Sequence, residues 1–174
     1  MIGNNRDLPV ATFVEIQSIR DAMAEELLGC AAIFEDDCRF ELEPFAAAFT
    51  RLADYFHTEP NLLPVISPTV ELPYRAREAA RMAMTRIAEL SDPTHQELCE
   101  HAAVAEAEVI TAEPETTHDC VLMLTVIAER VAYQTHYAEV ETIIRDLARR
   151  VDGIAAMEAS FALATTISKT PHPS

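Results

Sequence analysis

Three kinds of residue are scarce in this chain of 174 residues, which has three glycines, no tryptophan and a single lysine, Lys169. Few glycines leave few positions for the left-handed backbone that tight β-hairpins use. Neither a P-loop nor a G-x-G-x-x-G turn can be built from so few glycines, which argues against phosphate-cradling loops. Residues that favour helices are abundant instead, above all alanine, glutamate, arginine and leucine.

Long apolar runs and paired cysteine motifs are also missing. The longest strongly apolar run, Val121–Ala128, is too short to span a bilayer, and the first residues do not resemble a secretion signal. The chain has four cysteines, none in a C-x-x-C pair: Cys30, Cys38, Cys99 and Cys120. We therefore expect a cytoplasmic protein with reduced thiols and no contact with a membrane.

Acidic residues dominate the charge, with 29 acids against 13 bases and a net charge of −16. Residues 1–60 hold 12 acids and 4 bases, whereas residues 118–174 hold 7 and 5, so the acidity is concentrated before the last third. Such a field repels phosphate backbones, which argues against direct binding of nucleic acid. It suits a basic protein partner or a divalent cation.

The last third carries a sustained helical pattern. Between Thr116 and Ser168 there is no proline and one glycine, Gly153, and apolar residues recur along two heptad seams. One seam runs Val126, Tyr133, Val140, Leu147, Ile154, Phe161, and the other Met123, Arg130, Tyr137, Ile144, Val151, Glu158. A single helix over 117–164 would be about 70 Å long, so we expect either a break near Asp152–Gly153 or extension into a coiled-coil dimer.

Four further helices are expected before this segment. The first covers about 8–34, with Arg20 interrupting its apolar seam and Gly29 marking a close contact or a bend. The second covers about 40–57 and is opened by the acidic cluster Glu35, Asp36 and Asp37, since carboxylates disfavour a helix C-terminus. The third covers about 74–90. The fourth ends near Thr111 and starts from Asp92 or from the capping box at Thr94, and Thr116 or Thr117 caps the segment that follows.

These elements predict an all-α protein, an elongated helical bundle of about five helices with coiled-coil-like heptad seams. The four prolines in 58–73 predict an extended, apolar connector that packs along the bundle. The organisation is an N-terminal helical hairpin over 1–57, this proline-rich connector over 58–73, a helical unit over 74–168 and a frayed tail over 169–174, together forming one compact domain.

Metal chemistry has few candidates. A di-iron bundle needs two Glu-x-x-His pairs in helix interiors, but the one such spacing, Glu115 to His118, falls at a helix start. The residues left for a metal are His101, His136 and Glu97, and we predict no metal site and no cofactor. Cys120 and His118 fall on different helix faces, and no G-x-S-x-G elbow exists, so we predict no catalytic residues.

A polar-tipped group in the middle of the seam is the strongest candidate for an interaction site. Tyr133, His136 and Tyr137 share a helix face, and they could line a small pocket or pair with Arg20 or Arg130. The favoured interpretation is a core whose hydroxyls find hydrogen-bond partners. Arg130 and Glu158 occupy seam positions where charge specifies register.

One stretch carries a family resemblance. Over residues 92–128, an alanine- and glutamate-rich helix beginning Asp92-Pro-Thr-His-Gln-Glu ends in Glu113-Pro-Glu-Thr-Thr-His-Asp before a second helix. This resembles small, uncharacterised helical proteins of alphaproteobacterial genomes and their prophages. The resemblance implies a bacterial or phage-related chain in the cytoplasm and carries no functional residue across.

The predicted function is therefore a non-enzymatic protein-interaction or scaffold role. More specifically, we predict an acidic inhibitor that covers the binding surface of a basic partner protein. The predicted interaction residues are Glu35, Asp36, Asp37, Tyr133, His136 and Tyr137. We also expect the protein to form homo-oligomers. The alternative is a metal- or small-molecule-binding bundle of the ferritin-like or oxidoreductase class.

Overall fold

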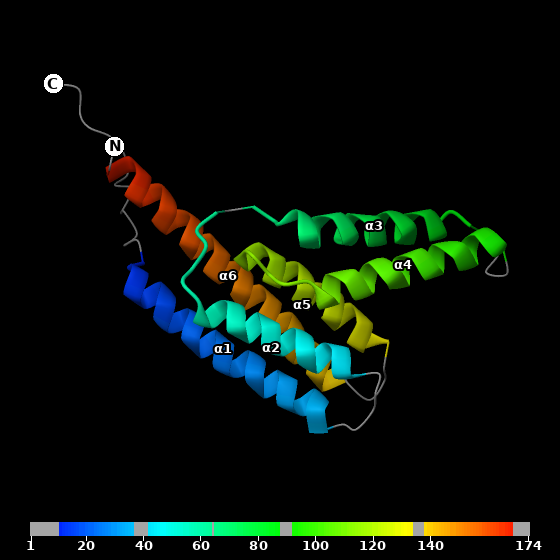
Figure 1. The fold of residues 1–174 in the computed structure, drawn as a ribbon, viewed down its shortest axis with the longest axis horizontal. Helices are drawn as coiled ribbons and strands as arrows, with labels where there is room; N and C mark the ends of the chain where they lie inside the picture. Colours follow the sequence, from blue (N-terminus) through cyan, green and yellow to red (C-terminus); the bar gives the residue numbers. More distant parts are fainter. Residues whose placement is uncertain (1–10, 37–41, 64, 88–91, 134–137, 169–174) are drawn as a thin grey trace, which may run out of the picture.

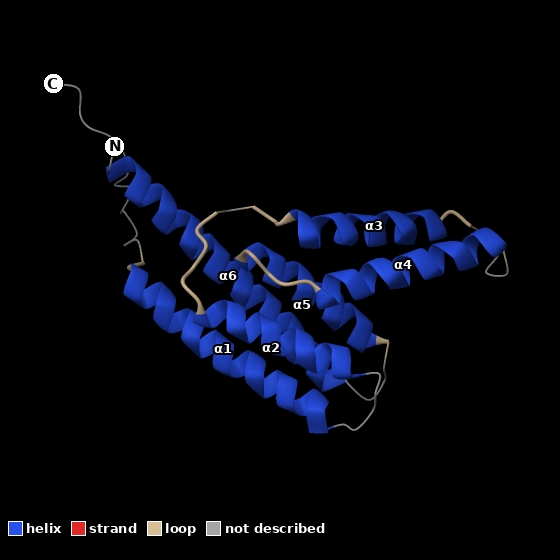
Figure 2. Ribbon diagram, viewed as in Figure 1, coloured by secondary structure: helices blue, strands red, loops and turns tan. Residues whose placement is uncertain are grey.

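The computed structural model describes residues 11–36, 42–63, 65–87, 92–133 and 138–168. Within these ranges the chain forms six α-helices and no strand (Figure 2). They are α1 (Phe13–Asp36), α2 (Glu43–His57), α3 (Pro68–Met84), α4 (Pro93–Thr111), α5 (Thr117–Ala132) and α6 (Ala138–Ser168). The all-α class is confirmed, although the chain has one helix more than expected. None of the described helices is both long and apolar enough to cross a bilayer.

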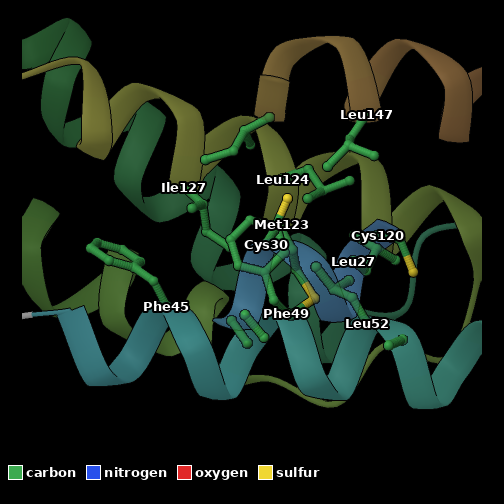
Figure 3. Packing of buried hydrophobic residues seen from close by; sticks show 14 of the residues in the cluster. Leu27, Cys30, Phe45, Phe49, Leu52, Cys120, Met123, Leu124, Ile127 and Leu147 are labelled. Carbon is green, nitrogen blue, oxygen red and sulfur yellow. The ribbon is translucent and has the colours of Figure 1, made fainter. Parts of the chain in front are cut away.

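The helices pair in sequence order, α1 with α2, α3 with α4 and α5 with α6. Figure 1 shows α1, α2, α5 and α6 gathered into one body, from which the hairpin of α3 and α4 projects. The four gathered helices, called the main bundle here, supply most of the apolar core. Figure 3 shows this core, where Leu27 and Cys30 of α1 meet Phe45 and Phe49 of α2 and side chains of α5 and α6.

The aromatic face predicted for the second helix is confirmed. Phe45, Phe49, Leu52 and Phe56 are all buried, and Phe34 of α1 stacks on Phe49 with ring centroids 5.6 Å apart. Each large side chain buried in this way stabilises the fold by about 1.5–3 kcal/mol. The helix–helix packing of the main bundle therefore rests on aromatic and aliphatic burial.

The last third contains two helices rather than one. The interruption lies between Ala132 and Ala138, and α6 runs unbroken through Gly153, so the predicted break near Asp152–Gly153 is wrong. Folding back lets the apolar faces of α5 and α6 pack on each other and share one core. Gly29 lies inside the uninterrupted α1, and a Cβ added there would meet nothing within 4 Å, so the expected close contact is also absent.

The acidic cluster closes the first helix instead of opening the second. Glu35 and Asp36 lie in the last turn of α1, both exposed, while Asp37 is outside the described residues. Exposure to water weakens the repulsion between a carboxylate and the helix C-terminus, which is at most about 1 kcal/mol at a surface. Burial of Phe34, one residue earlier, holds the helix to this point.

The third helix begins inside the predicted connector, at Pro68, and contains Pro73. Proline is suited to the first helical position, because its φ angle is preset and its missing N–H would have no helical partner there. The backbone N–H of Ser67 donates to Asp119 Oδ1 of α5 at 2.8 Å, which fixes the chain where the helix starts. Of the apolar connector residues, Val70 is buried and Ile66 packs on the core.

Two open questions about helix starts are resolved. Asp92 caps α4 by accepting a hydrogen bond from the backbone N–H of Thr94 at 2.8 Å, with Pro93 in the first turn. Thr116 caps α5 in a capping box with Asp119. The Asp119 carboxylate is fully buried and accepts from the backbone N–H groups of Ser67, Glu115 and Thr116, so it joins the start of α5 to the start of α3.

Candidate functional site

A shallow apolar groove runs between α1 and α6, which lie antiparallel along one side of the main bundle (Figure 1). Two hollows of about 510 and 440 Å³ follow its length. The first is lined mainly by Ile19, Ala22, Met23, Ile154 and Met157, and the second by Phe13, Phe161, Ala164 and Thr165. We call this feature the α1–α6 groove.

Small side chains open the groove. Ser18 and Ala22 on α1 face Gly153 on α6, so neither helix fills the space between them. A Cβ placed on Gly153 would meet no atom within 4 Å. The groove is therefore real free volume, and a larger side chain at this position can enter it without displacing the backbone.

Apolar side chains remain exposed around the groove. Phe13 is 42% and Ile19 40% exposed, although both line the hollows. A concentration of apolar surface along one seam is typical of a site that a partner covers.

One acid and one base lie at the edge of this groove, and exposed arginines of α6 stand opposite the acids of α1. Glu26 of α1 pairs with Arg150 of α6 at its edge, with Arg150 Nη1 2.7 Å from Glu26 Oε1, and the hydrogen bond from Arg150 lowers the pKa of Glu26. Arg150 also pairs with Asp146 at 3.1 Å, so its charge is already compensated. The described exposed charges of α1 are all acidic: Glu15, Asp21, Glu25, Glu26, Glu35 and Asp36.

The only base in α1, Arg20, is fully buried under the groove. Its Nη1 donates to Glu158 Oε1 of α6 at 2.6 Å, and its Nη2 donates to the backbone oxygen of Tyr55 at 3.0 Å. The guanidinium carbon lies 4.7 Å from the ring centroid of Tyr55 and 4.9 Å from that of Phe56. Buried charge is tolerated only when it is paired and hydrogen-bonded, and the two terminal nitrogens meet that requirement, whereas the buried Nε has no hydrogen-bond partner.

Thr117 completes this buried cluster by joining α5 to it. Its hydroxyl donates to Glu158 Oε2 at 2.5 Å and lies 3.1 Å from the hydroxyl of Tyr55. Burial raises the pKa of Tyr55, which keeps that phenol protonated. Because Arg20 and Glu158 are both almost inaccessible to solvent, the cluster links α1, α2, α5 and α6 and offers no surface to a substrate.

A second buried arginine, Arg77 of α3, lies where the projecting hairpin meets α5. It donates to Glu129 at 2.7 Å, to Glu106 at 3.1 Å and to Glu78 at 2.7 Å, and Arg81 donates to Glu129 at 2.6 Å. Burial alone would lower the pKa of Arg77 and raise that of Glu129. Their mutual attraction outweighs burial, so the pKa of Arg77 is raised and that of Glu129 is lowered.

Of the predicted central patch, only Tyr133 lies within the described residues. Tyr133 follows the end of α5 and is 77% exposed, so its ring is not part of the core. His136 and Tyr137 lie outside the described residues. Arg20 pairs with Glu158 rather than with this patch, and Arg130 lies 3.6 Å from Glu106.

Two of the three predicted metal candidates lie within the described residues. Glu97 and His101 are both exposed on α4, and His136 is outside the described ranges. Over the part of the chain that the structure describes, no three side chains of His, Cys, Asp or Glu gather closely enough to hold a metal ion. Glu97 and His101 are four residues apart on the exposed side of α4, a spacing that places neighbours on one helix face.

Sequence reasoning missed both the groove and the pairing of Arg20 with Glu158. A signal for the pair was present, because each residue is a charged interruption of an apolar seam and the two charges have opposite signs. The groove had a weaker signal in Gly153, a helical glycine without an obvious reason to be there.

Comparisons with known proteins found no match: no protein-family model, no curated protein and no solved structure is similar to this chain.

Proposed function

We propose that the protein is a non-enzymatic interaction protein that binds a basic, amphipathic helix of a partner in the α1–α6 groove. The observation that carries the proposal is the combination of two apolar hollows with exposed Phe13 and Ile19 along one helix seam. Grooves of this kind take the apolar face of a helix, with anchors spaced three or four residues apart.

Charge specifies the kind of partner. The exposed charges of α1 are acidic in every described case, and the whole chain carries a net charge of −16. A helix with lysine or arginine on its flanks would gain favourable long-range attraction, whereas an acidic helix would be repelled. By binding such a helix, the protein would block its other contacts and so act as an inhibitor of a basic partner. We place this role in the cytoplasm, in a bacterial or prophage setting.

A second copy of the chain is the competing occupant of the groove. Exposed apolar seams favour self-association, and coiled-coil-like pairing through α6 would give a homo-oligomer. The like charges of two α1 helices oppose this arrangement, so we expect the homo-oligomer to be weaker than the complex with a basic helix.

The test is a binding titration with a labelled peptide of about 18 residues in which leucines recur at helical spacing between lysines. Fluorescence anisotropy compares the wild type with Gly153→Leu, which fills the first hollow, and with the matched control Gly29→Leu on α1. Both glycines are helical and have free space at Cβ, so both variants should fold.

We expect Gly153→Leu to weaken binding about tenfold, which corresponds to about 1.4 kcal/mol, while Gly29→Leu leaves it unchanged. Binding should also weaken at about 0.5 M salt and disappear when the lysines of the peptide are replaced by glutamates. Equal affinity of the two glycine variants, or equal binding of the acidic peptide, would refute the proposal. Sedimentation over a range of concentrations separates self-association from peptide binding.

A further inference from the structure

Two sulfur atoms and one nitrogen atom that could bind a metal ion lie close together on the α3–α4 hairpin, away from the α1–α6 groove. Cys99 Sγ lies 3.3 Å from Met84 Sδ and 3.6 Å from His95 Nδ1. Met84 is the last residue of α3, and His95 and Cys99 lie near the start of α4. We call these three residues the sulfur cluster.

The helix geometry explains why the donors converge. His95 and Cys99 are four residues apart on α4, so their side chains lie on one face, one turn above the other. Helices α3 and α4 pack antiparallel (Figure 1), and the contact of Met84 Sδ with Cys99 Sγ places Met84 at that face. All three positions are on described helices.

The donor types select a class of metal. Thiolate and thioether sulfur favour soft ions such as Cu(I), whereas Ca²⁺ and Mg²⁺ require oxygen ligands. Structural zinc sites use four ligands from cysteine, histidine or carboxylates, and only two of the three donors here belong to that set. A thiolate, a thioether and an imidazole together form a three-coordinate S₂N set suited to Cu(I).

The spacing of the donors fits one ion. Metal–sulfur bonds of about 2.3 Å and metal–nitrogen bonds of about 2.0 Å, at trigonal or tetrahedral angles, place neighbouring donors roughly 3.5–4 Å apart. The two contacts of Cys99, at 3.3 and 3.6 Å, are near this range already. Both contacts share Cys99 Sγ, so an ion bound to this sulfur is within reach of the other two donors.

Access distinguishes Cys99 from two other cysteines. Cys99 is exposed, whereas Cys30 and Cys120 are buried. Burial raises the pKa of Cys30 to about 11 and that of Cys120 well above its ordinary value, so neither supplies a thiolate readily. The neighbouring carboxylates Glu97 and Glu100 on α4 add an acidic field that attracts a cation.

We propose that Met84, His95 and Cys99 bind one Cu(I) ion per chain. The Cys99 thiol loses its proton to solvent as the copper–sulfur bond forms, and His95 Nδ1 and Met84 Sδ each donate a lone pair. The metal arrives and stays as Cu(I), so no electron is transferred.

The test is an anaerobic titration of the full chain with Cu(I) in competition with a chromophoric Cu(I) chelator. We expect one equivalent to bind the wild type. Cys99→Ser, His95→Gln and Met84→Leu should each weaken binding roughly tenfold or more, with the loss of the thiolate having the largest effect. The matched controls are Met82→Leu on α3 and His101→Gln on α4, both exposed positions outside the cluster, and they should leave the affinity unchanged.

X-ray absorption at the copper edge supplies a readout that depends on the ligands themselves. The wild type should show two sulfur and one nitrogen neighbours, and Met84→Leu should show one sulfur fewer. Unchanged affinity in Cys99→Ser, or equal effects of Met84→Leu and Met82→Leu, would overturn the proposal and leave the close sulfur contacts as a simple hydrogen bond. Circular dichroism of each variant confirms that the helices are retained.

Discussion

The main bundle and the α3–α4 hairpin are held by different forces. In the main bundle, Phe34, Phe49 and Phe56 are almost wholly buried and lie in one continuous apolar core with residues of α5 and α6. The hairpin supplies fewer residues to that core, among them Val70, Val109 and Ile110. Its base is held instead by the ion pairs of Arg77 and Arg81 with Glu78, Glu106 and Glu129.

The two buried arginines make the difference plain. Arg20 is buried between two aromatic rings and one carboxylate, that of Glu158, so salt in the solvent cannot screen this ion pair. Arg77 is also buried, but two of the glutamates that hold it, Glu78 and Glu129, are themselves partly exposed. The main bundle should therefore resist salt, whereas the attachment of the hairpin should weaken as salt is added.

The largest expected effect is on the buried pair of the main bundle. Glu158→Ala leaves the charge of Arg20 buried without its partner, so we expect the free energy of unfolding to fall by about 3–5 kcal/mol. Urea denaturation measures the change. The double variant Arg20→Met, Glu158→Leu should recover most of the loss, because the charge is then removed along with its partner.

Glu25→Ala on the exposed face of α1 is the control, with an expected change within about 0.5 kcal/mol. If Glu158→Ala is as mild as this control, the buried pair does not hold the main bundle together.

The second effect is on the hairpin. Arg77→Met keeps the length of the side chain but removes its hydrogen bonds to Glu106 and Glu129, so we expect a local loss of about 1.5–3 kcal/mol. Hydrogen exchange should show faster exchange in α3 and α4 and unchanged exchange in α1 and α2. About 1 M salt should reproduce part of this change in the wild type.

Arg75→Met is the matched control, because Arg75 is an exposed arginine on the same helix, paired with Glu71. Faster exchange throughout the main bundle in Arg77→Met would show that the two regions unfold as one unit.

The smallest effect is a dependence on pH through Glu129. The pKa of this carboxyl is lowered from its ordinary value of 4.5, because attraction to Arg77 and Arg81 outweighs burial. A group whose pKa is lower in the folded state stabilises the fold above the unfolded pKa. That contribution is lost as the pH falls from about 4.5 through the folded pKa.

Urea denaturation between about pH 6 and pH 3 should therefore show a shallower loss of stability in Glu129→Gln than in the wild type. Glu108→Gln, at an exposed position on α4, serves as the control. An identical pH dependence in Glu129→Gln and the wild type would mean that this ion pair does not stabilise the hairpin.

Local patterns predicted much of the fold. The inward face of α2, the end of α4 at Thr111 and the caps at Asp92 and Thr116 follow from residues within one or two helical turns, and the structure has them. The predicted helix boundaries were wrong where contacts between residues far apart in the sequence determine where a helix begins or ends. The start of α3 is fixed by Asp119, 52 positions along the chain from Ser67, and the fold-back before α6 is fixed by packing against α5.

The candidate site was harder to predict than the fold. The α1–α6 groove exists because small residues of two helices far apart in sequence face each other, and no local pattern encodes that pairing. The sulfur cluster depends on Met84 meeting a different helix. The predicted patch of Tyr133, His136 and Tyr137 stays a prediction, because only Tyr133, just after the end of α5, lies within the described residues.

The buried pair also has a consequence for biosynthesis. Arg20 and Glu158 are separated by 138 residues, so a ribosome adding about 5–20 residues per second makes the carboxylate roughly 7–30 s after the guanidinium. Throughout that interval α1 and α2 cannot close around Arg20 without leaving its charge unpaired. We expect the nascent hairpin of α1 and α2 to stay open during translation, and the main bundle to form only when α6 has left the exit tunnel.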